Sequence, residues 1–213
     1  MIMIDRGVVS AAAQYAEEVL SKEGFRHVSV VVANCKMLVA EIEGQGKEKS
    51  NIDLNAVILA GYLHDISTAA QGFHDHHVKS AEMAVEFLQE LDAPAELISK
   101  VERAILTHVD PLPAEQRESM PLESRILYDA DKLGRLSGLA IITSLIELGS
   151  RFPNRAVTGE VLAAVLRHIE ERFVELYQSL NTAPAREMAK TKFGNTLAFL
   201  DGVIEHLTDA TPV

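Results

Sequence analysis

The sequence predicts an all-α protein on three observations. Apolar residues recur at helical spacing through most of the chain. The one stretch that would also suit a buried strand, Val30-Val31-Val32, continues to Glu43, which is long for a strand. The 213 residues are 47% hydrophobic and 24% charged, a composition that excludes disorder for most of the chain and allows one sizeable core.

Glycine and capping residues divide these periodic stretches into helices. Gly24 ends the first helix, Asn51 or Asp53 is expected to cap the third, and Asp92-Ala93 separates the fourth from the fifth. The third helix is the apolar run that ends at His64. The other expected helices cover residues 10–22, 27–43, 80–91, 94–108, 122–131, 135–149, 157–180 and 184–207.

The adjacent pair His64-Asp65 closes the apolar run VILAGYL. At helical spacing Val57, Ala60 and His64 share one face, so the histidine points inward with the apolar side chains. Burying an imidazole and a carboxylate is costly unless something pairs with them, and a bound metal is the natural partner. The alternative is a core histidine hydrogen-bonded to its neighbourhood, with Asp65 as an ordinary helix-end residue; the pair alone supports both equally.

Other histidines also stand just before or after apolar stretches. His27 opens HVSVVVANCKMLVA, His76 and His77 precede VKSAEMAVEFL, and His108 closes ISKVERAILTH. Asp131 follows in RILYDADKLG. In chain order this gives His, His-Asp, His, His, Asp, which favours a metal site.

These residues and their contexts resemble the HD superfamily of metal-dependent phosphohydrolases. VILAGYLHDIS is similar to the family's apolar helix ending in HD, and LYDADKLGRL is similar to its late D-A-D-[KR]-L segment. HVKSAEMAVEFLQELDAPAELISKVERAILTH resembles the intermediate helix pair. HIEERFVELYQSLNTAPAREMAKTKFGNTLAFLDGVIEHL resembles, more weakly, the terminal helices of the small bacterial members.

The resemblance implies a fold and a set of metal ligands. The fold would be a single helical HD-domain bundle over residues 1–213, with a metal-binding core at about 25–135 and additional C-terminal helices at about 136–207. Asp131 is preferred to Asp129, and His77 to its rival His76. The first metal would be held by His27, His64, Asp65 and Asp131, and a second metal or the substrate by His77 and His108.

The donor set also indicates the cofactor and the chemistry. Imidazole and carboxylate ligands suit Mn, Fe, Co, Ni or Zn, with Mg also compatible, as one or two ions. Asp65 would bridge the ions and take part in activating water. Basic side chains that could hold substrate phosphate, with a solvated surface role as the alternative for each, are Lys79, Lys132, Lys192 and Arg26.

The chain departs from the family pattern at three places. Val30 stands where many members have a phosphate-holding Arg, Ile66-Ser67-Thr68 replaces the residues that often follow HD, and Gly134 stands where an acidic residue is common. His74 and Asp75 form a second HD dipeptide, which we interpret as loop or helix-cap residues because no apolar run precedes it.

The predicted function is metal-dependent hydrolysis of a phosphoester or phosphoanhydride, in a nucleotide or another small phosphorylated metabolite, by metal-activated water. The alternatives are an HD-type di-iron oxygenase and a non-catalytic metal- or ligand-sensing module. The net charge of -11 argues against a nucleic-acid polymer or an anionic membrane as partner. We expect a cytoplasmic protein, with Cys35 in the core. The sequence does not determine the oligomeric state, although a homodimer is compatible with it.

Overall fold

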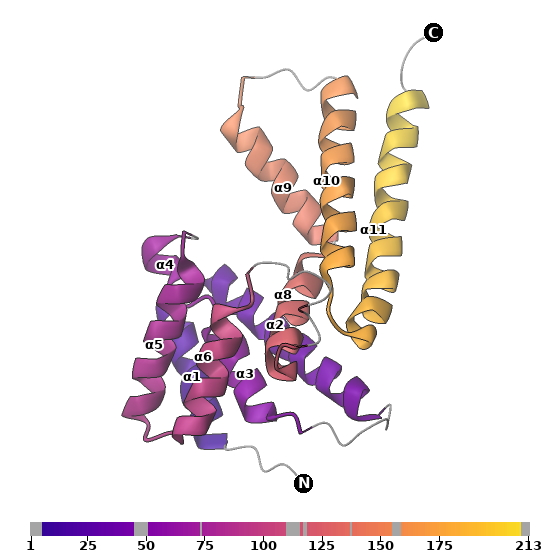
Figure 1. Ribbon diagram of the computed structural model, residues 1–213. Coiled ribbons are helices and arrows are strands. Elements are labelled where there is room, and N and C mark those ends of the chain that lie inside the picture. Colours follow the sequence, from indigo (N-terminus) through magenta and orange to yellow (C-terminus); the bar gives the residue numbers. More distant parts are fainter. Residues whose placement is uncertain are drawn as a thin grey trace. The chain divides into compact units, whose positions relative to one another are not determined.

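The computed structural model describes residues 6–44, 51–72, 74–109, 116, 119–136, 138–154 and 159–209. Every secondary-structure element in these ranges is a helix, which confirms the all-α prediction (Figure 1). The helices are α1 Arg6–Val19, α2 Lys22–Gly44, α3 Leu54–Leu63, α4 Thr68–Gln71, α5 His76–Glu90, α6 Ala95–Leu106, α8 Leu122–Arg135, α9 Gly138–Arg151, α10 Gly159–Ser179 and α11 Ala183–Asp209.

Two helix starts depend on identifiable local chemistry. Asp53, one of the two expected caps, begins α3 by accepting a 3.2 Å hydrogen bond from the backbone N–H of Ala56. Helix α5 begins four residues before the expected Ser80, because Asp75 adopts a left-handed conformation with φ 50° and turns the chain into the helix at His76. The short helix α4 was not predicted, since four residues are too few to show a periodic pattern.

Contacts divide the chain into two compact units, which we describe separately. The first comprises residues up to Gly134 together with Asn181–Ala185, and the second comprises Arg135–Leu180 and the residues from Arg186 onward. In the second unit α10 and α11 are in contact, since the rings of Tyr177 and Phe193 stack with centroids 5.8 Å apart. None of the described helices has the length and hydropathy needed to cross a membrane.

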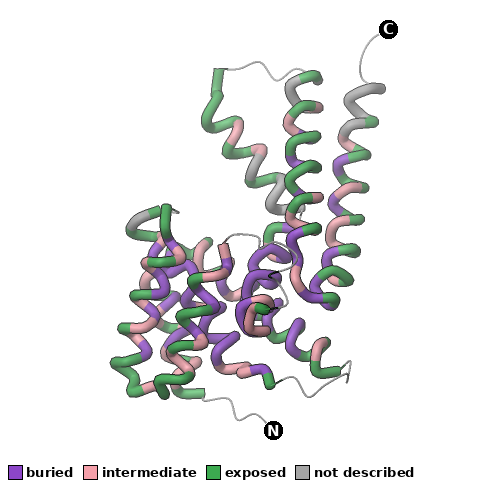
Figure 2. The backbone as a smooth tube through the Cα atoms, in the orientation of Figure 1, coloured by how far each residue is buried: buried purple, intermediate pink, exposed green. Residues whose placement is uncertain are grey.

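Helix α3 lies at the centre of the first unit and packs against α1, α2, α5 and α6. Seven of its ten residues are buried, as expected for a helix that is apolar on most sides (Figure 2). The approach to α2 is close at Gly61, where an added Cβ would lie 2.8 Å from Val32 Cγ2. This contact fixes the separation of α2 and α3, which carry His27 and His64.

Helix α8 completes the core of the first unit, with all but a few of its residues buried. Asn34 on α2 donates a 3.0 Å hydrogen bond to the backbone carbonyl of Ala130, 96 positions away in sequence. Helix α8 is thereby anchored to α2 at the residue just before Asp131.

Candidate metal centre

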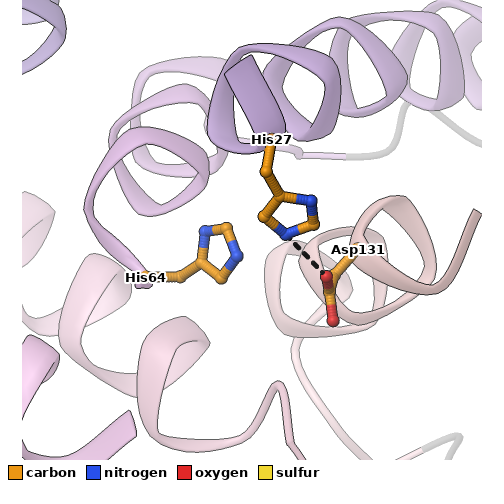
Figure 3. A group of neighbouring side chains, drawn as sticks. All are labelled: His27, His64 and Asp131. Atoms are coloured by element: carbon orange, nitrogen blue, oxygen red, sulfur yellow. Dashed lines mark ion pairs between the residues drawn. The ribbon is translucent and has the colours of Figure 1, made fainter. Parts of the chain in front are cut away.

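Three helices bring His27, His64 and Asp131 together. His27 lies on α2, His64 is the C-cap of α3 and Asp131 lies on α8, and their side chains converge (Figure 3). His27 Nε2 is 3.2 Å from Asp131 Oδ1, and one ligand atom from each residue lies within 4.8 Å of the other two. We call these residues the His27 group.

A second group, which shares His64 with the first, consists of His64, Asp65 and His108. In this group too, one ligand atom from each residue lies within 4.8 Å of the other two. We call it the His108 group. His64 and Asp65 both take part because α3 ends at Leu63, so the chain turns between the two side chains. All three residues are buried.

Asp65 presents its two oxygens to different histidines. Oδ2 lies 3.5 Å from His64 Nε2 and 3.7 Å from His27 Nε2. Oδ1 lies 3.3 Å from His76 Nε2 and 3.8 Å from His108 Nε2. The carboxylate is therefore placed between the two sides of the centre, as a bridging ligand must be.

Backbone carbonyls fix the tautomers of two histidines. His64 Nδ1 lies 2.9 Å from the carbonyl oxygen of Gly61, and His108 Nδ1 lies 2.6 Å from that of Ile105. A carbonyl only accepts hydrogen bonds, so in both rings Nδ1 carries the proton. Each Nε2 then turns its lone pair toward Asp65, the state in which imidazole binds a metal.

The charge states also suit a metal site. Burial lowers the pKa of His64 to about 4, so this ring is neutral at pH 7. For Asp65, burial raises the pKa, but the surrounding histidines, His64 first among them, outweigh burial and hold the pKa below its ordinary value. The centre therefore offers neutral imidazole and an ionised carboxylate.

Two buried atoms in the centre, His64 Nε2 and Asp65 Oδ1, have no hydrogen-bond partner among the described residues. An unsatisfied buried polar atom costs about 1–3 kcal/mol, so native proteins rarely leave two of them side by side. A cation between them would accept both lone pairs. Nitrogen and oxygen donors together fit a divalent transition metal, and the described His/Asp groups are able to hold one.

The two aspartates of the D-A-D segment have different surroundings. Asp129 accepts four hydrogen bonds of 2.7 to 3.1 Å, from the backbone and side chain of Asn181 and of Thr182. Both oxygens of the Asp129 carboxylate are therefore occupied by hydrogen bonds from the segment between α10 and α11. Asp131, the predicted ligand, is the one that faces His27.

The structure places His76, the rival of the predicted His77, beside Asp65. His76 is 7% exposed and contacts Asp65, whereas His77 is half-buried on the neighbouring side of α5. His76 precedes the buried Ser80, Ala84 and Leu88 at four-residue steps, a pattern that identifies the core-facing side of the helix. Ser67 also donates a 3.0 Å hydrogen bond to the His76 carbonyl and so fixes the start of α5.

The four basic residues considered for phosphate binding lie in different environments. Arg26 is exposed, and Lys79 pairs at 2.8 Å with the exposed Glu82. Lys192 is half-buried on α11 in the second unit, where burial lowers its pKa. Lys132 is buried beside Asp131.

His27 differs from the other histidines of the centre. Its side chain is 31% exposed, and none of the described residues accepts a hydrogen bond from its Nδ1. A Cβ added at Gly134 would lie 3.8 Å from His27 Cε1, so the glycine leaves space beside the ring. The centre is therefore open at His27 and closed at His108.

A helical bundle with a buried centre of histidines and aspartates, including an adjacent His-Asp pair, defines the class of this protein. The HD domain model matches residues 11–136, and the chain belongs to this family. No curated protein matches the chain in sequence.

Solved structures show the same fold at low sequence identity. A predicted HD superfamily hydrolase from an uncultured Thermotogales bacterium is 20% identical over 92% of this chain and 91% of its own, with a TM-score of 0.61. Bacillus subtilis YpgQ in complex with ADP is 18% identical over 96% and 97%, with a TM-score of 0.67. An HD-superfamily hydrolase from Bacillus thuringiensis is 18% identical over 96% of both chains, with a TM-score of 0.66.

Proposed function

We propose that this protein is a metal-dependent phosphohydrolase that acts on a nucleotide or another small phosphorylated metabolite. The observation that carries the proposal is the placement of Asp65, whose two oxygens face different histidines of one buried centre. His27, His64, Asp65 and Asp131 would hold the first ion. His76 and His108 would face a second ion, with Asp65 between the two.

The chemistry that divalent cations supply at such a site is activation of water and polarisation of a phosphoryl oxygen. The chain supports that chemistry through the fixed tautomers of His64 and His108, which aim Nε2 at the centre. The opening at His27 gives a substrate its approach, and Arg26 beside it is exposed. Lys79, three residues after His76, is a second candidate cation for phosphate, with a side chain that is 44% exposed and pairs with Glu82.

The substrate class has support from similarity and from charge. YpgQ, whose fold this chain shares, was solved in complex with ADP. The net charge of -11 does not prevent binding of a small phosphate compound, because bound divalent ions dominate the local field.

The test begins with elemental analysis of protein purified without chelator or affinity tag. A panel of nucleotides and sugar phosphates is then assayed for phosphate release with added Mn, Co, Ni or Mg. We expect bound or activating metal together with phosphate release, both lost in His64→Ala. The matched control, His168→Ala, removes an exposed histidine of α10 and should change neither quantity.

Other results would contradict the proposal in distinct ways. Two irons per chain, with O2 consumption and no phosphate release, would identify the oxygenase alternative. Metal binding without turnover across the panel would identify a sensing module. Absence of metal binding would show that the histidines and aspartates have a structural role.

A further inference from the structure

Lys132 is a buried lysine attached to both sides of the centre. Its Nζ donates a 2.9 Å hydrogen bond to Asp131 Oδ2 and a 3.3 Å hydrogen bond to the carbonyl oxygen of His108. The ammonium also lies over the ring of Tyr128, 4.8 Å from the centroid. Lys132 thus contacts one member of the His27 group and one member of the His108 group.

The surroundings of Lys132 differ from those of other paired lysines in this chain. Lys79 and Lys190 pair with carboxylates three residues away, but their side chains are 44% and 59% exposed. The side chain of Lys132 is 8% exposed. Removing an ammonium from water is costly, so a lysine persists at such a position only where fixed partners satisfy it.

The two oxygens of the Asp131 carboxylate have different partners. Oδ2 accepts from Lys132, while Oδ1 lies 3.2 Å from His27 Nε2. With Lys132 bound at Oδ2, Oδ1 is the oxygen that Asp131 turns toward the His27 group. The bond to the His108 carbonyl gives the ammonium a second acceptor.

We propose that Lys132 is a positioning residue of the metal centre, which holds Asp131 as a one-oxygen ligand and links it to the segment that carries His108. This inference rests on the proposed metal centre. It assigns Lys132 to the support of a ligand, in place of the phosphate-binding role that its position next to Asp131 suggested.

Three roles for Lys132 predict different effects of Lys132→Met on metal affinity. A positioning residue gives weaker binding, because residues that orient metal ligands typically contribute 10- to 100-fold in affinity. A lysine that acted only as a nearby positive charge would give tighter binding once removed, because it repels the ion. A phosphate-binding lysine would leave metal affinity unchanged and raise KM for the substrate.

The experiment measures Co2+ and Mn2+ dissociation constants of the full chain by calorimetry, and the visible absorption spectrum of the Co2+ form. We expect Lys132→Met to weaken binding about tenfold or more and to change the Co2+ spectrum, because both oxygens of Asp131 become available. Lys132→Arg, which keeps a cationic donor, should restore part of the affinity. The control Lys190→Met removes an exposed, paired lysine and should bind as wild type does.

Circular dichroism first establishes that each variant is folded, and Lys132→Gln replaces Lys132→Met in the same measurements if the latter is not. Tighter or unchanged binding in the folded variant, with an unchanged spectrum, would overturn the inference while leaving the proposed function intact. If wild-type protein binds neither ion, the metal centre is wrong and the inference falls with it.

Discussion

The two ends of the centre differ in how firmly they are held. At one end His108 is 1% exposed, its Nδ1 donates to the Ile105 carbonyl, and its own carbonyl accepts from Lys132. At the other end His27 is 31% exposed, and no described residue accepts from its Nδ1. Since a second hydrogen bond normally orients a metal-binding histidine, the closed end is preorganised and the open end is adaptable.

The largest effect should come from Asp65, because it faces both ends. Asp65→Ala should abolish metal retention, whereas His108→Ala should leave an ion in the His27 group. Metal content after gel filtration, measured by mass spectrometry, separates the two results. His74→Ala, at a side chain that is 92% exposed, is the control. Equal metal content in Asp65→Ala and wild type would show that Asp65 is not a ligand shared by the two ends of the centre.

Gly61→Ala should act on the open end through the spacing of α2 and α3. The new Cβ would lie 2.8 Å from Val32 Cγ2, so the helices must separate and the free energy of unfolding should fall by about 1–3 kcal/mol. His27 and His64 lie on these two helices, so affinity in the His27 group should fall as well. Urea unfolding and calorimetry measure the two quantities. Gly194→Ala, where an added Cβ meets nothing within 4 Å, is the control.

His76→Ala and His77→Ala distinguish adjacent positions at the closed end. His76 Nε2 lies 3.3 Å from Asp65 Oδ1, so His76→Ala should weaken binding of the second ion by about tenfold or more. The His77→Ala variant should bind two ions with wild-type affinity. Titration with Mn2+ followed by electron paramagnetic resonance gives the stoichiometry and affinity. The reverse result would restore His77, the residue first predicted from sequence.

Asp75 should show the smallest effect. Its φ of 50° is a conformation that glycine adopts freely and β-branched residues adopt poorly. Asp75→Gly should therefore leave the free energy of unfolding within about 1 kcal/mol of wild type, whereas Asp75→Val should lower it by about 1–3 kcal/mol. Thermal unfolding of the chelator-treated protein provides the comparison. Equal stability of both variants would mean that the start of α5 tolerates other turns.

Much of the fold could be predicted from sequence because the long helices have strong apolar periodicity. Helices α8 to α11 begin and end within a few residues of the expected positions. The start of α5 could not be predicted, because it depends on a left-handed Asp75 that no periodic pattern reveals. Once the helix is extended back to residue 76, His76 falls on the same buried side as Ser80, Ala84 and Leu88.

In the centre, the sequence around the D-A-D motif favoured Asp131 over Asp129 as the metal ligand. The contacts that occupy Asp129 come from residues far away in sequence. Asp129 is bound to Asn181 and Thr182, more than fifty positions later, and sequence spacing gives no sign of that contact. Lys132 was recognised by its position next to Asp131. It also donates to the His108 carbonyl, 24 residues earlier, a contact that only the fold reveals.

The contact between Asp129 and the α10–α11 connection also has a consequence for synthesis of the protein. A nascent chain carries His27, His64, Asp65 and Asp131 long before it reaches Thr182. Until then the Asp129 carboxylate, two residues from Asp131, lacks the four donors that satisfy it. We therefore expect the segment that carries Asp131 to be fixed only after Asn181 and Thr182 have been synthesised.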